Sequence, residues 1–216
     1  WRRYLMALDG FANLQTSIAS WMSRDDLTAI IPDFITLAEV RIGQDLRVRA
    51  MEKRSQMVTI SGQEYYGLPD GYVQARHIKV ATTSPHDLEY RTPESIDLLN
   101  TQKLANGTGV PYYYTIAGNE LRVLPRPDSV YTIELLFYAT PDPLSTSQNS
   151  NLVYEKYPNV YLYACLIEAS TYVRDVEGAK GWGILYGQAV QTAQTADLKD
   201  RHSGGALRVV GEHIGY

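Results

Sequence analysis

Apolar side chains recur with two different periods in this chain, and the change of period divides it into parts. In residues 26–50 and 157–198 they recur every three or four positions, as on one face of a helix. Most of the intervening sequence consists of short runs rich in Val, Ile, Thr and Tyr that Gly and Pro interrupt, which is typical of strands. The pattern predicts an α+β fold. The expected parts are a helical bundle from residues 1–54 and 157–198, an inserted antiparallel β-sandwich-like domain at 55–156, and an extended tail at 199–216.

The N-terminal part is expected to hold two helices. The first carries its apolar side chains at helical spacing: Leu14, Ile18, Trp21 and Met22. We expect Asp25 or Asp26 to cap the second helix, and Pro32 falls where a first helical turn tolerates proline. The stripe of the second helix ends with Arg41 and Asp45 among apolar residues, which indicates a face that meets a partner as well as a core.

The inserted part alternates strand-like runs with turn signals. Strands are expected at residues 57–60, 76–82, 112–116, 120–124 and 131–138, within a total of about five to seven. Ala117-Gly118-Asn119 marks a tight hairpin, and Pro93 opens a short helix. Residues 139–156 are polar and rich in Pro, Ser and Asn, so they are interpreted as a linker back to the helical part.

Two more helices are expected in the C-terminal part. Pro158 opens the first, which is apolar nearly all round between Val160 and Ile167 and should lie at the centre of a bundle or between subunits. The second runs from about residue 179 to residue 198, and its first half contains three glycines: Gly181, Gly183 and Gly187. Each costs about 1 kcal/mol against alanine in an exposed helix. We expect them to permit close helix packing; the alternative is that the helix simply tolerates them.

The helical period stops after residue 198. Gly204 and Gly205 follow a polar stretch and precede a short run with the composition of a strand: Leu207, Arg208, Val209 and Val210. No hairpin partner lies nearby in the sequence. The run is therefore either a frayed terminus or a strand that adds to the sheet edge of another chain.

Charge and composition narrow the classes of function. The formal net charge is −4, from 20 basic and 24 acidic residues, which argues against a protein that grips nucleic acid. The basic cluster is interleaved with acids, as on a solvated face or in intersubunit ion pairs: Arg41, Arg47, Arg49, Lys53 and Arg54 with Glu39, Asp45 and Glu52. The longest apolar run, residues 160–167, is too short to span a membrane. Neither the first residue nor Met6 begins a signal peptide, so synthesis in the cytoplasm is expected.

No set of residues has the spacing of a catalytic or metal site. The acidic candidates stand outside any recognisable motif: Glu64, Asp70, Glu94, Glu120 and Glu134. The histidines are too scattered for a metal-binding pair: His77, His86, His202 and His213. Cys165 is the sole cysteine, which excludes an internal disulfide, and its apolar neighbours indicate a buried structural thiol. We expect no catalytic residue, no metal and no cofactor.

Several blocks of sequence resemble one protein family. The run IPDFITLAEVRIGQDLRVR, and the blocks LPDGY, YYYTIAGNELRVLPRPDSVYTIELLFYATPDPLS and YPNVYLYACLIEASTYV, are similar to the SU10-like adaptors of short-tailed phages, in the same order. The resemblance covers most of residues 13–198. It implies a structural virion protein that forms a ring, dodecameric by analogy, between the portal protein and the tail nozzle or tail fibre proteins. DNA would pass through the lumen without specific binding, and no membrane would be involved.

The resemblance also implies where partners bind. Helices would contact the portal and neighbouring subunits through these residues: Phe34, Arg41, Asp45, Arg47, Arg49, Tyr161, Tyr163, Trp182 and Tyr186. The tail would reach along the portal through Leu207, Arg208, Val209 and Val210. The β region would face the nozzle through Tyr112, Tyr113 and Tyr114.

Two other functions remain open at this point. The aromatic residues of the β region could serve as stacking platforms in a carbohydrate- or receptor-binding module of a virion. A weak cell-wall-degrading activity is the other alternative. A binding module predicts a monomer whose tyrosines line an open groove, whereas an adaptor predicts apolar helices in subunit interfaces.

Overall fold

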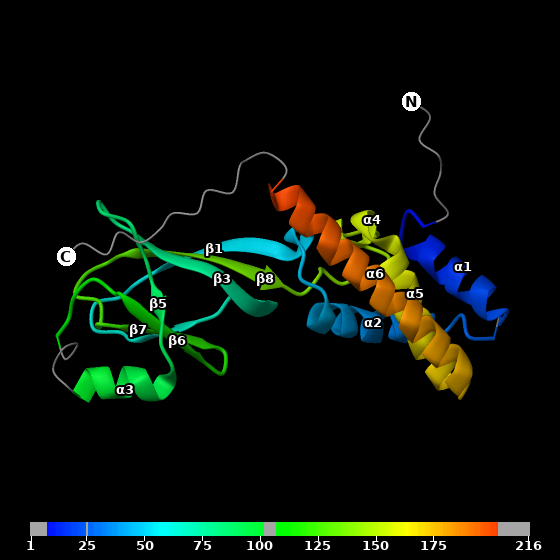
Figure 1. Ribbon diagram of the computed structural model, residues 1–216, viewed down its shortest axis with the longest axis horizontal. Coiled ribbons are helices and arrows are strands. Elements are labelled where there is room, and N and C mark those ends of the chain that lie inside the picture. Colours follow the sequence, from blue (N-terminus) through cyan, green and yellow to red (C-terminus); the bar gives the residue numbers. More distant parts are fainter. Residues whose placement is uncertain (1–7, 25, 102–106, 203–216) are drawn as a thin grey trace, which may run out of the picture. The chain divides into compact units, whose positions relative to one another are not determined.

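The computed structural model describes residues 8–24, 26–101 and 107–202 (Figure 1). Its fold is α+β, as predicted. The chain divides into two compact units: unit 1 comprises Trp1–Ala50 and Pro141–Tyr216, and unit 2 comprises Met51–Thr140. The chain therefore leaves unit 1 at residue 50 and returns to it at residue 141. The sequence pattern had placed these two boundaries after residues 54 and 156.

Unit 1 is helical. Its helices are α1 (Phe11–Met22), α2 (Ile31–Asp45), α4 (Leu152–Lys156), α5 (Pro158–Tyr172) and α6 (Val176–His202). Helix α5 packs against α1, α2 and α6, and nearly every residue from Val160 to Ile167 is buried. This all-round burial is the reason for its continuous apolar run. Figure 1 shows α6 crossing in front of α5. The predicted positions of α1, α5 and α6 are confirmed within a few residues.

Helix α2 is shorter than its sequence pattern predicted. It begins at Ile31, and no side chain caps it. The proposed cap by Asp26 is wrong, because Asp26 instead accepts hydrogen bonds from Arg24 at 2.6 Å; Asp25 lies outside the described residues. Pro32 does occupy the first turn. After Asp45 the chain becomes extended at Leu46, whose side chain is fully buried.

The segment interpreted as a polar linker, residues 139–156, is mostly part of unit 1. It contains α4, and Asn151 caps that helix by accepting a 2.8 Å hydrogen bond from the Tyr154 N–H. Leu144 and Val153 are buried in the same segment. The polar composition of the segment therefore gave no indication of its helix or of its buried residues.

The described residues of unit 2 form two four-stranded sheets and one α-helix. One sheet has the order β1-β8-β3-β4, formed by β1 (Glu52–Val58), β8 (Thr132–Ala139), β3 (Tyr72–Ala81) and β4 (His86–Asp87). The other has the order β2-β7-β6-β5, formed by β2 (Tyr65–Gly67), β7 (Glu120–Leu124), β6 (Tyr113–Ala117) and β5 (Glu89–Tyr90). Helix α3 (Pro93–Thr101) begins at Pro93, as expected. One buried cluster joins residues of both sheets: Tyr66, Ile78, Val80, Leu121, Val123, Ile133, Leu135 and Phe137.

Three predictions about the strands need correction. The described residues form eight strands rather than five to seven, and β5 pairs with β6 in parallel, so the domain is not wholly antiparallel. Strand β1 begins at Glu52, earlier than residue 57. It pairs with β8 along its whole length, and its neighbouring residues Lys53 and Arg54 are both exposed. The hairpin between β6 and β7 is confirmed: Gly118 adopts a φ of 61°, which glycine tolerates without strain.

Candidate interaction surfaces

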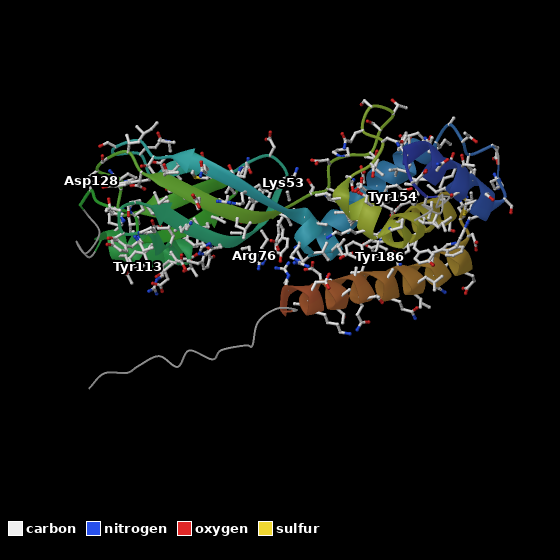
Figure 2. All side chains as sticks on the ribbon, turned by 90° about the horizontal axis from the view of Figure 1, so that it is seen from above. Lys53, Arg76, Tyr113, Asp128, Tyr154 and Tyr186 are labelled. Carbon is white, nitrogen blue, oxygen red and sulfur yellow. The ribbon has the colours of Figure 1, made fainter. Side chains whose placement is uncertain are left out.

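The aromatic residues predicted for the helical interfaces lie largely inside unit 1. Tyr161 is fully buried, and its hydroxyl accepts a 2.8 Å hydrogen bond from Asn151. Phe34 is buried against Tyr172, with ring centroids 5.5 Å apart. Tyr186 points from α6 toward the other helices (Figure 2), and its hydroxyl donates to Asp45 Oδ2 at 3.1 Å. Within the described subunit, these side chains join the helices of unit 1 to one another.

The basic residues predicted for the interfaces also have partners in the same unit. Arg41 Nε donates to Glu168 of α5 at 3.0 Å, and Arg47 donates to the backbone oxygens of Gly43 and Leu46. Arg49 contacts Asp197 near the end of α6. The interleaved charges on this segment therefore form contacts within the subunit.

Three aromatic rings meet where α1, α5 and α6 come together. Tyr163 of α5 stacks on Trp182 of α6 at 6.2 Å, and Trp182 lies 5.6 Å from Trp21 of α1. Beside them is an open cavity of about 380 Å³, whose lining includes both tryptophans, Met22 and Leu185. Trp21 remains half exposed at its edge. Tyr163 and Trp182 are thus the predicted interface residues nearest to an accessible apolar surface.

The outward side of α6 is free of charge over much of its length. No residue from Gly181 to Ala196 is charged, although this side of the helix is exposed. Ile184 is 64% exposed and Leu185 38% exposed, and the remainder of this face is mainly Gly, Gln and Thr. We refer to the exposed side chains between Gly181 and Ala196 as the α6 outer face.

The glycines of α6 do not mark close packing inside the subunit. A Cβ placed on Gly181, Gly183 or Gly187 meets no heavy atom within 4 Å in the described part of the chain. The prediction that they permit close helix packing is therefore wrong for contacts within unit 1. Gly181 and Gly187 are exposed, and Gly183 is half-buried.

The three tyrosines predicted to face the nozzle do not share one surface. Tyr113 packs with the small cluster around Ile96 and Leu124, whereas Tyr114 packs against the main core on the other side of β6. Tyr112 is exposed, and its ring stacks on His86 at 4.4 Å. Tyr113, labelled in Figure 2, also lies 5.3 Å beneath the Arg91 guanidinium. Such alternation offers a ligand single rings rather than one continuous stacking platform.

Three of the acidic and histidine side chains considered for chemistry are engaged in ion pairs: Glu64, Glu134 and His77. Glu64 is buried between Arg122 and Arg126, and Glu134 contacts Arg54 and Lys79. Over the described residues, no group of three His, Cys, Asp or Glu side chains could hold a metal ion. The prediction that Cys165 is buried is confirmed, and burial raises the pKa of its thiol.

The tail residues predicted to bind the portal, Leu207, Arg208, Val209 and Val210, lie outside the described residues. Among the helices that the structure describes, none is both long enough and apolar enough to cross a lipid bilayer.

Comparison with known proteins identifies the family. The pattern of the SU10 adaptor protein family matches residues 10–210, a range that includes almost all of both units. No curated protein matches the chain. The resemblance inferred from the sequence blocks is therefore confirmed, and it extends through the helices, both sheets and part of the tail. The chain belongs to the SU10 adaptor protein family, whose members are adaptor proteins of phages.

Proposed function

We propose that this protein is a head-to-tail adaptor that forms a homo-oligomeric ring, dodecameric by analogy with its family, between the portal and the tail nozzle. The observation that carries the proposal is the family match over residues 10–210. A phage adaptor is a structural protein of the virion. Its role is to bind other virion proteins rather than to catalyse a reaction. DNA passes through the lumen of the ring, and the formal net charge of −4 opposes docking of the DNA backbone there.

The α6 outer face supports the ring proposal. Interface cores are depleted in charged residues, because a charge that loses water without gaining a partner is costly. This face has no charge from Gly181 to Ala196 and exposes Ile184 and Leu185. Gly181 and Gly187 would let the backbone of a neighbouring helix approach closely, which gives a role to glycines that nothing inside the subunit requires.

The proposed contacts with the portal, the nozzle and the neighbouring subunits use residues that the sequence analysis assigned to them. The strand-like run at residues 207–210 binds the portal by adding to a sheet edge or groove there. The exposed ring of Tyr112 is the member of the tyrosine group best placed to meet the nozzle or fibre proteins. Trp182 and Tyr163 contribute to the subunit contact through the aromatic surface that they form with Trp21.

Native mass spectrometry of the purified chain, alone and mixed with portal rings of the same virus, tests this function. We expect a monomer alone and the addition of many copies to each portal ring, with a fixed stoichiometry that gives the copy number. A folded monomer that does not bind portal rings at any concentration would contradict the adaptor assignment. Screening the same monomer against glycans would then test the binding-module alternative.

Replacing Ile184 by aspartate should weaken assembly on the portal about tenfold, because the variant buries an unpaired carboxylate in the subunit contact. Assembly is measured as the chain concentration that half-saturates the portal rings in the same experiment. The matched control is Val130→Asp, which introduces the same charge at an exposed aliphatic position of unit 2 and should assemble like the parent. If the Ile184 variant and the parent half-saturate the portal rings at the same concentration, α6 is not part of the subunit contact.

A further inference from the structure

The open cavity beside Trp21 and Trp182 combines aromatic rings with a single carboxylate. The two indole rings lie 5.6 Å apart between centroids, and Asp175 is the charged side chain among the residues that line the cavity. Met22 and Leu185 add aliphatic surface to the lining. All of the lining residues belong to unit 1, and the cavity measures about 380 Å³. Its shape is therefore set by α1, α5 and α6 alone.

Glycines leave space on the α6 side of the cavity. Asp175, Gly178 and Trp182 follow one another at spacings of three and four residues, so they lie on one side of the start of α6. Gly181 also lines the cavity, and a Cβ placed on it meets no heavy atom within 4 Å in the described part of the chain. A larger side chain at Gly181 would therefore take up part of the cavity.

The charges around the cavity favour a cation. Asp175 caps α6 by accepting a 2.9 Å hydrogen bond from the Gly178 N–H, and its full negative charge exceeds the partial positive charge of a helix N-terminus. Helices α1 and α5 bring residues near their C-terminal ends, Met22 and Ser170, to the same lining. Neither helix has a basic residue in its last turn. Because helix C-termini carry partial negative charge, the lining is negative overall.

No cation from the described residues occupies this site. Arg24 follows α1 closely, but it is engaged in an ion pair at 2.6 Å with a neighbouring acid. Arg174 precedes the capping aspartate in the sequence, but it does not line the cavity. The cation–π contacts within the described residues lie over tyrosines of unit 2 rather than over either tryptophan. A cation for the cavity must therefore come from another molecule.

We propose that this cavity binds the guanidinium of an arginine that a partner protein presents. Indole attracts a cation more strongly than the other aromatic rings, and a flat guanidinium stacks on it while donating to a carboxylate. The face of Trp21 is available, since its side chain is half exposed. Met22 and Leu185 would contact the aliphatic part of the arginine. That the partner is a neighbouring protein of the virion rests on the proposed function, whereas the site itself belongs to the single chain.

Titration of the full chain with the peptide acetyl-Gly-Arg-Gly-amide tests the site. The indole N–H signals in the NMR spectrum report binding directly, because Trp21 and Trp182 are two of the three tryptophans in the chain. Single Trp→Phe variants assign them. We expect both signals to shift and to saturate. The matched probe carries citrulline, which has the shape of arginine without its charge, and it should bind about tenfold more weakly.

Two pairs of variants locate the binding in the cavity. Asp175→Asn keeps an oxygen that can cap α6 but removes the charge, so it should bind the arginine peptide about fivefold more weakly. Its control is Glu177→Gln, which removes a charge of α6 outside the lining and should bind like the parent. Gly181→Leu fills the cavity and should abolish the shifts, whereas Gly183→Leu adds the same side chain outside the lining and should bind like the parent.

Several results would overturn the proposal. They are an absence of saturable shifts, equal affinity for the arginine and citrulline peptides, and parent affinity in Gly181→Leu. A lysine peptide that binds as tightly as the arginine peptide would also overturn it, because the stacked guanidinium would then not matter. If Gly181→Leu does not fold, the citrulline probe and Asp175→Asn decide. Every measurement uses the single chain, so a failure here leaves the mass-spectrometry test of portal binding unaffected, and the reverse also holds.

Discussion

Replacing Asn151 by alanine should destabilise the folded chain by about 3 kcal/mol. Its Oδ1 caps α4 through the Tyr154 N–H, while its Nδ2 donates to the Asp142 oxygen and to the Tyr161 hydroxyl, each at 2.8 Å. Loss of the cap contributes about 1 kcal/mol, and each acceptor left without its donor contributes about the same. The side chain is buried, so water does not replace these bonds freely. The free energy of unfolding in urea measures the effect.

Asn151→Ser separates the two parts of this effect. Serine retains an oxygen that can cap the helix but loses the amide donors, so about 2 kcal/mol should be lost. Ser150→Ala, next to it in the sequence, removes only a hydrogen bond to exposed Glu155 and should change stability by less than about 0.5 kcal/mol. A loss below about 1 kcal/mol for Asn151→Ala would mean that water molecules form hydrogen bonds with the groups that Asn151 contacts in the parent.

The sequence predicted the elements whose burial is uniform or strictly periodic. The continuous apolar run from Val160 to Ile167 predicted that α5 lies at the centre of a bundle or between subunits, and the structure buries it against other helices of unit 1. The hairpin at Gly118 was equally clear, because its positive φ requires a residue without Cβ strain. In each case the local signal and the tertiary environment agree.

The features that the sequence did not predict are those in which a polar residue is buried. Asn151 stands in a polar segment that resembled a linker, yet its side chain is buried and makes three hydrogen bonds. Glu39 stands among interleaved charges that were interpreted as a solvated face or as intersubunit ion pairs. Burial of a charged residue depends on its tertiary partners, and Leu144, which donates to Glu39, lies far away in the sequence. Spacing within a helix carries no information about such partners.

For the predicted interface residues, too, residue type alone did not indicate whether a side chain is buried or exposed. Tyrosine and tryptophan favour interfaces in general, but they also fill cores, and the structure assigns Tyr161 to the core of unit 1. The absence of charge from Gly181 to Ala196 was visible in the sequence, although only the structure places that stretch on an exposed side. Charge depletion combined with exposure is therefore the basis on which α6 is proposed as a contact surface.

Glu39 should make the stability of the protein fall as the pH rises from about 4.5 to about 7. Burial raises the pKa of its carboxyl from 4.5 to about 7, and the Leu144 N–H lowers it only in part. The folded state thus binds the proton more tightly than the unfolded state. The stabilising contribution is complete below the unfolded pKa and is lost as the pH rises through the folded pKa. A pKa difference of this size corresponds to about 3 kcal/mol.

Urea unfolding of the parent and of Glu39→Gln at pH 4.5, 6 and 8 measures this contribution, because the amide does not titrate and other groups cancel in the difference. We expect the parent to lose about 3 kcal/mol relative to the variant across that range. The nearby groups Tyr161 and Cys165 do not interfere, since burial raises both of their pKa values further above this range. Glu134→Gln is the control: hydrogen bonding to Lys79 lowers the pKa of the Glu134 carboxyl from its ordinary value of 4.5, so its contribution is lost only at lower pH and its difference should stay nearly constant over this range. A difference between parent and Glu39→Gln that stays constant with pH would mean that Glu39 is as well solvated in the folded chain as in the unfolded one.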